Sequence, residues 1–133
     1  MYTYDTSVKL HDTDAAGVLF FGNYFRLIHE AYENYMAAIG FDFYHIIHEA
    51  DFLLLIVHAE ADFKQPLHVG DKVEIRIRSD KIGRTSFTLG YEVVNTEDTV
   101  VATGETIHAN ISKETGKPVV IPDGLRAALE EIA

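Results

Sequence analysis

One segment of the sequence carries the stripe of a long amphipathic helix, and any fold must bury that stripe. Between residues 23 and 39, apolar side chains recur every three or four positions, the spacing of one helix face: Ile28, Ala31, Tyr32, Tyr35, Met36 and Ile39. Polar and charged residues occupy the opposite side. Asn23 is placed to cap the first turn, and Gly40 to end the helix. A stripe of this length needs an apolar partner surface.

Five other segments alternate apolar and polar residues, which is typical of strands with one buried face. The first spans residues 2–10, and the others lie near 53–64, 73–78, 87–93 and 100–113. Turn residues separate them, and short helices are expected at 42–50 and 125–132. The order predicts an α+β fold in which a five-stranded antiparallel sheet wraps around one long central helix. With 133 residues and no linker, the chain is expected to form a single domain over residues 1–133.

Composition excludes several classes of function. The chain has no cysteine, so disulfide frameworks, thiolate metal sites and cysteine nucleophiles are excluded. No apolar run reaches the roughly 18–20 residues that span a bilayer, and the first residues lack the pattern of a signal peptide. A formal charge of −10 repels nucleic-acid phosphates and anionic lipid. We therefore expect a cytoplasmic enzyme or binding domain, without nucleic-acid or membrane partners.

Histidines offer one metal hypothesis. His45 and His48 are three residues apart, which places both on one face of a short helix, and Glu49 and Asp51 follow. The spacing specifies no third ligand, so histidines at a helix surface or end are the favoured interpretation.

The segment DTDAAG at residues 12–17 lies between the first strand and the helix and is the sharpest chemical feature. Aspartates there form turns readily, because the side chain accepts hydrogen bonds from nearby backbone amides. An aspartate followed by small and apolar residues also suits a shielded reactive carboxylate. The residues alone leave both interpretations open. His11 and Asp12 are expected to shape the turn rather than to react.

The motif resembles a known family. HDTDAAGVLFFGNYFRLIHEAYENYM at residues 11–36 is similar to the signature of hotdog-fold acyl-CoA thioesterases of the 4-hydroxybenzoyl-CoA thioesterase type. In this signature two aspartates one residue apart precede two small residues, a glycine, two apolar and two bulky residues, and then asparagine-tyrosine. IVHAEADFKQPLHVGDKVEI at residues 56–75 resembles the family's second strand, turn and third strand. The resemblance covers essentially the whole chain.

Details of the motif bear on the substrate. Ala15-Ala16, the IVH of residues 56–58 and the QP turn are similar to dihydroxynaphthoyl-CoA thioesterases of quinone biosynthesis. Ala15 stands where the 4-hydroxybenzoyl group often has proline, and Phe20-Phe21 where tyrosine, histidine or tryptophan is common. An apolar or larger aromatic acyl group is therefore favoured over a hydroxylated benzoyl ring.

The resemblance implies an acyl-CoA thioesterase that converts a coenzyme A thioester (with an aromatic or medium acyl group) to a carboxylic acid and free coenzyme A. It implies no cofactor or metal. Asp14 would be the catalytic carboxylate, and the backbone N–H of Phe21 the oxyanion donor. Because a free aspartate is ionised at pH 7, Asp14 suits a base or a nucleophile. In the same motif, Gly17, Phe20 and Gly22 are assigned to substrate binding, the glycines being available for unusual backbone angles.

Further binding residues are expected on the strands. Five of the 11 cations fall within 13 residues: Lys72, Arg76, Arg78, Lys81 and Arg84. They are either solvated strand residues or a cationic patch for a polyanion, and the thioesterase resemblance gives Arg76, Lys81 and Arg84 the phosphates of coenzyme A. His58 is expected either to pair with a carboxylate in the sheet core or to line the acyl pocket.

Two other functions remain as alternatives. A hotdog hydratase or dehydratase commonly carries Asp-x4-His, which is absent here. A non-catalytic acyl-thioester binding module is the second, and the intact Asp14 argues against it. The resemblance also implies a homodimer joined through sheet edges, usually paired into a homotetramer, with the active sites at the subunit interface. The identity of the acyl group, and the choice between coenzyme A and acyl carrier protein, stay open.

Overall fold

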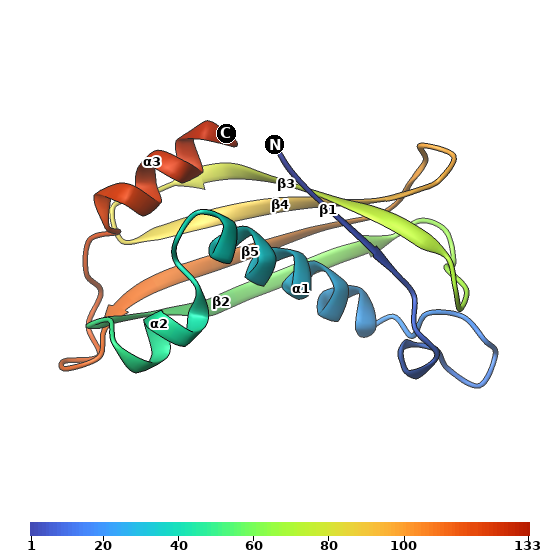
Figure 1. Cartoon of the computed structure of the whole chain (residues 1–133), viewed down its shortest axis with the longest axis horizontal. Coiled ribbons are helices and arrows are strands. Elements are labelled where there is room, and N and C mark those ends of the chain that lie inside the picture. The colour runs from blue at the N-terminus through green and yellow to red at the C-terminus, as the bar shows by residue number, and fades with distance from the viewer.

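A five-stranded antiparallel sheet curves around the long helix, as the computed structural model of residues 1–133 shows (Figure 1). The strand order is β1-β3-β4-β5-β2. In chain order the elements are β1 (Tyr2–Ser7), the 3₁₀-helix η1 (Leu10–Asp12), α1 (Asn23–Ala38), α2 (Phe43–His48), β2 (Phe52–Phe63), β3 (Lys72–Ile82), β4 (Ser86–Asn95), β5 (Val100–Ser112) and α3 (Asp123–Glu131). The expected hotdog fold is confirmed.

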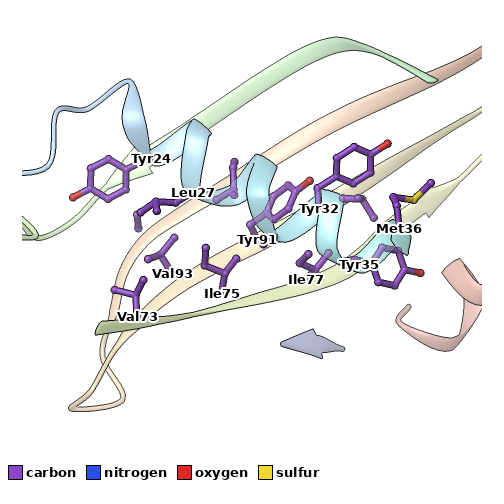
Figure 2. Close-up of a cluster of buried hydrophobic side chains, with 14 of the residues drawn as sticks. Tyr24, Leu27, Tyr32, Tyr35, Met36, Val73, Ile75, Ile77, Tyr91 and Val93 are labelled. Carbon is purple, nitrogen blue, oxygen red and sulfur yellow. The ribbon is translucent and has the colours of Figure 1, made fainter. Parts of the chain in front are cut away.

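The predicted helical stripe is the centre of the core. Leu27, Ala31 and Met36 of α1 are fully buried against the concave face of the sheet. Figure 2 shows this packing, in which side chains of α1 lie over those of β3 and β4: Val73, Ile75, Ile77, Tyr91 and Val93. Each large apolar side chain buried in this way contributes about 1.5–3 kcal/mol. This burial holds the long helix against the concave face of the sheet.

The two ends of α1 differ in how well the sequence predicted them. Gly40 follows the last turn with a φ of +88°, in the left-handed conformation expected of it. The expected Asn23 cap is wrong, because Gly22 occupies the capping position and Asn23 is the first helical residue. The amide of the Asn23 side chain instead donates to the backbone oxygen of Asp12, at 2.8 Å. This contact ties α1 to the preceding loop.

Two differences from the expected strands affect the site. β1 ends at Ser7 rather than at residue 10, because the chain turns into η1. β2 lies at one edge of the sheet and is largely exposed, and its pairing with β5 shifts by one residue between Ile56 and His58. Membrane crossing would need a longer and more apolar helix than any in the chain.

Candidate active site

A loop at residues 8–22 connects β1 to α1 and is held in place by its own pairing. Thr13 bridges Leu19, and Val18 bridges His68 in the turn before β3. The amide of Phe20 donates to the carbonyl oxygen of Asp12 at 3.0 Å. The loop is therefore a short hairpin docked against the start of the helix.

The tip of this hairpin is a tight turn from Asp14 to Gly17. The amide of Gly17 donates to the carbonyl oxygen of Asp14 at 3.0 Å, and the amide of Asp14 donates to that of Val18 at 2.9 Å. Gly17 has a φ of +79°, a conformation that strains residues with a side chain. The expectation of an unusual backbone angle is thus confirmed for Gly17.

Gly22 is small for a different reason. Its φ is −63°, which is ordinary helical backbone, so the expected unusual angle is wrong here. A Cβ on Gly22 would lie 3.0 Å from Cε2 of the Phe20 ring, closer than such contacts normally occur. Gly22 therefore makes room for the Phe20 ring beside the helix start.

Asp12, the first aspartate of the motif, is a buried anchor. Its carboxylate accepts two hydrogen bonds from the Arg26 guanidinium, both 2.6 Å, and one from the backbone amide of Lys9 at 3.0 Å. Burial alone would raise the pKa of Asp12, but the hydrogen bonds from Arg26 and Lys9 and the Arg26 charge hold it below its usual range. Asp12 shapes the loop, as expected, by joining it to α1.

Asp14, the second aspartate, is exposed at the hairpin tip. Its Oδ1 accepts the backbone amide of Ala16 at 2.8 Å, and no group in the chain donates to Oδ2. One carboxylate oxygen thus forms the turn and the other is free. The turn-forming interpretation is therefore confirmed, and the free oxygen is compatible with the reactive role, which stays a prediction.

The start of α1 lies next to this hairpin and offers a hydrogen-bond donor. No acceptor in the chain takes the backbone N–H of Phe21, which directly precedes the capping residue Gly22. A helix N-terminus carries about half a positive charge, so this donor suits a developing negative oxygen. A free carboxylate oxygen and a free amide therefore lie on the same loop between β1 and α1.

Aromatic side chains surround the Phe21 amide. The ring of Phe21 lies 4.6 Å from that of Phe20 and 6.2 Å from that of Phe63, measured between ring centres. Tyr24 contacts Phe63 at 4.7 Å. A hollow of about 280 Å³ opens between the rings of Phe21, Tyr24 and Phe63 and the Gln65–Pro66 turn. Phe21 is 61% exposed, which leaves an apolar surface beside the donor.

A second hollow runs alongside α1. It has a volume of about 330 Å³ and lies between α1 and the edge strand β2. Its walls are mostly apolar, and Tyr91 and Thr106 reach it from the middle of the sheet. Eight residues line it in all: Phe25, Arg26, Ile28, His29, Ile56, Ala59, Tyr91 and Thr106. We call it the α1–β2 groove.

The cationic run does not gather at the site within one chain. Lys72 pairs with Ser7 next to the loop, whereas Arg84 follows the opposite end of β3. An 11-residue strand spans about 35 Å. Arg76 is paired with Glu74 and Asp98, at 2.7 and 2.8 Å. Arg78 is likewise held by a carboxylate, whereas Lys81 and Arg84 form no ion pair. Their proposed contact with phosphate stays a prediction.

His58 lies beside a carboxylate, as one expectation had it, but outside the sheet core, and its place in the acyl pocket stays a prediction. It is half-exposed, with its Nε2 3.6 Å from Glu60, so it is outside the sheet core. It pairs with Ile107, whereas its neighbour Ala59 pairs with Thr106 and lines the α1–β2 groove. Because adjacent strand residues point to opposite faces, His58 points away from the groove. The register shift at residue 57 causes this placement.

The histidines of α2 are occupied by protein contacts. His45 Nδ1 lies 2.8 Å from the Glu49 carboxylate, and His48 packs on Tyr44. No group of three or more potential ligands in the chain is arranged to hold a metal ion.

Sequence reasoning missed two sets of residues. Arg26 is 14 positions from Asp12, so no local pattern indicated their ion pair. Tyr91 and Thr106 fit their strands as ordinary core-facing residues, and only the three-dimensional structure brings them to the groove.

Comparisons with known proteins agree on one family. A sequence model of the thioesterase-like superfamily matches residues 8–129. A 1,4-dihydroxy-2-naphthoyl-CoA hydrolase of Nostoc punctiforme is 37% identical over 129 residues, which are 97% of this chain and 86% of the relative. One of Crocosphaera subtropica is 37% identical over 112 residues, 83% of this chain and 82% of the relative.

Solved structures give the same result. The crystal structure of a 1,4-dihydroxy-2-naphthoyl-CoA thioesterase from Synechocystis is 31% identical, with a TM-score of 0.92 over 98% of this chain and 96% of that one. A gentisyl-coenzyme A thioesterase is 30% identical, with a TM-score of 0.86 over 96% of this chain and 99% of that one.

The anchor predicts a pH-dependent stability. Asp12→Asn leaves the Arg26 charge with only the distant Glu30 carboxylate, at 3.9 Å, and because Arg26 is 38% exposed we expect a loss of about 2–3 kcal/mol at pH 7. The pKa of Asp12 is lowered by folding, so its contribution is complete above about pH 4 and disappears as the pH falls further. The stability difference between wild type and variant should therefore shrink below about pH 4.

Urea unfolding at pH 7, and at steps down to pH 3, measures this difference. Asp51→Asn, which changes an exposed carboxylate without a side-chain partner, is the matched control. A difference that is constant with pH would contradict the assigned role of the ion pair.

Proposed function

This chain belongs to the thioesterase-like superfamily and is an acyl-CoA thioester hydrolase, and from this premise we propose that Asp14 is its reacting carboxylate and that its acyl group is aromatic. One observation carries the proposal. Asp14 keeps one carboxylate oxygen free, and it lies on the hairpin docked beside the unpaired Phe21 amide. A reacting group and an oxyanion donor are the two parts that thioester hydrolysis requires.

In the proposed reaction, the Phe21 N–H donates to the thioester carbonyl oxygen and stabilises the negative charge that develops there. Such a donor is worth about 10²–10³ in rate. With Asp14 as general base, its free oxygen takes a proton from water while the water oxygen bonds to the carbonyl carbon. The carbon–sulfur bond then breaks, and the proton passes to the coenzyme A thiolate.

With Asp14 as nucleophile, its free oxygen bonds directly to the carbonyl carbon and expels the thiolate. The resulting mixed anhydride reacts with water, which releases the acid and restores the carboxylate. Both routes use the same two groups. The hydrogen bond from Ala16 to Oδ1 orients the carboxylate in either case.

Two features support an aromatic acyl group. The surface beside the Phe21 amide is built from Phe20, Phe21, Tyr24 and Phe63, and aromatic side chains favour stacked or edge-on contacts with rings. The relatives reported above are named for the thioesters of dihydroxynaphthoic and gentisic acids, which are aromatic.

The edge strand supports the proposed dimer. β2 is 12 residues long and exposes Leu55, Ile56 and Val57, and a free strand edge with apolar side chains favours pairing with another strand. Two copies related by a two-fold axis would join their β2 edges antiparallel and bring the α1–β2 grooves together. Pairing of dimers into a tetramer and a cytoplasmic location stay predictions.

Asp14→Asn tests the reacting carboxylate. The change keeps Oδ1, and with it the bond from Ala16, but removes the charge. We expect kcat on an aryl-CoA thioester to fall by at least about 10², with KM and the melting temperature nearly unchanged. Thiol release measures turnover, and Asp5→Asn on β1 is the matched control. A folded Asp14→Asn variant with near wild-type kcat would remove Asp14 from the mechanism.

Alanine substitutions of Arg76, Lys81 and Arg84 test the contact with phosphate. If these side chains hold coenzyme A, each change should raise KM about two- to tenfold and leave kcat nearly constant, because the contact binds ground state and transition state alike. Lys117→Ala, at an exposed loop position, is the control. An unchanged KM in all three variants would make these cations solvated strand residues.

Val57→Lys tests the dimer. Val57 is 62% exposed near the middle of β2, and a lysine in each copy would place like charges close to the two-fold interface. We expect the dimer to dissociate at least tenfold more readily, measured by light scattering after size exclusion over a dilution series. Val69→Lys, half-exposed outside the strands, is the matched control. Equal masses for wild type and Val57→Lys at every concentration would rule out the β2 interface.

A further inference from the structure

We propose that Tyr91 is a specificity-determining residue, whose hydroxyl donates a hydrogen bond to an oxygen substituent on the acyl ring in the α1–β2 groove. The inference rests on the proposed function, because it requires an aromatic acyl group, and it assigns the acyl ring to the α1–β2 groove rather than to the hollow beside Phe21. It concerns which aromatic acids are preferred, not how the thioester bond is cleaved.

Tyr91 is the end of a buried chain of polar side chains. Its Oη lies 2.8 Å from Oγ1 of Thr106, which lies 2.7 Å from Nε2 of His108. All three side chains are at least 95% buried on the concave side of the sheet. Tyr91 and Thr106 line the groove, whereas His108 does not. Figure 2 shows the Tyr91 hydroxyl turned toward α1.

Tyr91, Thr106 and His108 carry more polar hydrogens than there are hydrogen bonds between them. Burial lowers the pKa of His108 to about 3, with His29 adding to the effect, so the imidazole is neutral at working pH and carries one N–H. Tyr91, Thr106 and His108 thus supply three hydrogens, but only two hydrogen bonds join them. One hydrogen is left without an acceptor in the chain.

The surroundings of His108 decide where that hydrogen lies. Its ring stacks on Phe87, with centres 4.8 Å apart and planes 8° apart, and contacts Tyr32 at 4.4 Å. Nδ1 has no partner. With the hydrogen on Nδ1, the unpaired donor would be enclosed among aromatic rings, whereas with the hydrogen on Nε2 the unpaired donor is the hydroxyl of Tyr91, which lines the groove. The hydrogen is therefore assigned to Nε2, which donates to Thr106.

The position of the Nε2 hydrogen determines which way the hydroxyls of Thr106 and Tyr91 donate. Because Thr106 Oγ1 accepts from His108, its own hydrogen is donated to Tyr91 Oη. The Tyr91 hydrogen then has no acceptor in the chain and is available to the groove. Burial raises the pKa of Tyr91 well above its usual value, which keeps this hydrogen in place.

The rest of the groove defines the ligand. Phe25, Ile28, Ile56 and Ala59 form its apolar walls, and its volume is about 330 Å³. Arg26, which is paired with Asp12, and the exposed His29 also line the groove, so Tyr91 supplies its one buried donor without a partner. A mostly apolar slot with such a donor matches a ring that bears an oxygen acceptor. A site built to bond a substrate oxygen discriminates strongly against the analogue that lacks it, since the donor is then buried unpaired.

Binding measurements on the Asp14→Asn protein test the inference without turnover. The probes are 2-naphthoyl-CoA and its isomers that carry one ring hydroxyl. We expect one isomer to bind at least about tenfold more tightly than the parent compound. Tyr91→Phe in the same background keeps the ring and removes the donor, so this ratio should fall toward one. Thr106→Val removes the hydroxyl that bonds to Tyr91 and should also lower this affinity ratio.

The controls separate recognition from folding. Tyr44→Phe removes an exposed hydroxyl on α2 and should leave the affinity ratio unchanged. If Tyr91→Phe does not fold, Thr106→Val provides the test. Equal weakening of parent and hydroxylated compounds by Tyr91→Phe would indicate a purely structural role and overturn the inference. So would the absence of any preference, or of any binding, in the Asp14→Asn protein.

The two proposals can fail separately. If the Asp14→Asn protein still turns the thioesters over, the role of Asp14 is wrong, and the ratio of kcat/KM for the same pair of compounds tests Tyr91. If Asp14→Asn abolishes turnover but no hydroxylated isomer is preferred, the mechanism stands and the role of Tyr91 is wrong.

Discussion

The ion pair between Asp12 and Arg26 is the constraint on which the candidate site depends. It joins the loop after β1 to the first turns of α1, and the Asp12 backbone oxygen accepts from Phe20 and Asn23 in the same region. The relative position of the Asp14 carboxylate and the Phe21 amide is fixed by these contacts. Both proposed reacting groups keep an unused hydrogen-bonding atom, Oδ2 of Asp14 and the N–H of Phe21. The first aspartate of the motif thus holds the loop, and the second keeps the free oxygen that the proposed reaction uses.

The sequence predicted the fold well because the relevant signals are local. The stripe of α1 and the alternation in the strands depend on spacings of two to four residues, and burial follows them in nearly every case. The predictions were wrong where a residue outside the local pattern determined the role of a side chain or a glycine. Asn23 does not cap α1 because the carbonyl of Asp12, 11 residues earlier, takes its side-chain amide. Gly22 needs no special angle, and its small size is required only by the ring of Phe20.

The candidate site was predictable in its motif and not in its surroundings. Asp14 and Phe21 were indicated by the resemblance, and the structure adds the free oxygen and the free amide. The expected position of His58 in the sheet core was wrong because one additional residue in β2 reverses which face each later residue points to, and alternation alone does not reveal such a shift. The Tyr91–Thr106–His108 chain joins two strands, and its members look like ordinary core residues when each strand is read separately.

The unequal edges of the sheet have a consequence for how far the protein can assemble. β2 offers 12 residues with apolar side chains, whereas β1, at the opposite edge, has only six, with outward positions that include Thr3 and Asp5. Pairing of β2 with its own copy consumes that edge in both chains and exposes only two short, polar edges. Sheet growth by edge addition would then terminate by itself, since short polar edges are poor templates for a further strand. Because β1 is shorter than β2, a chain with one apolar edge strand would thus be prevented from polymerising into fibres.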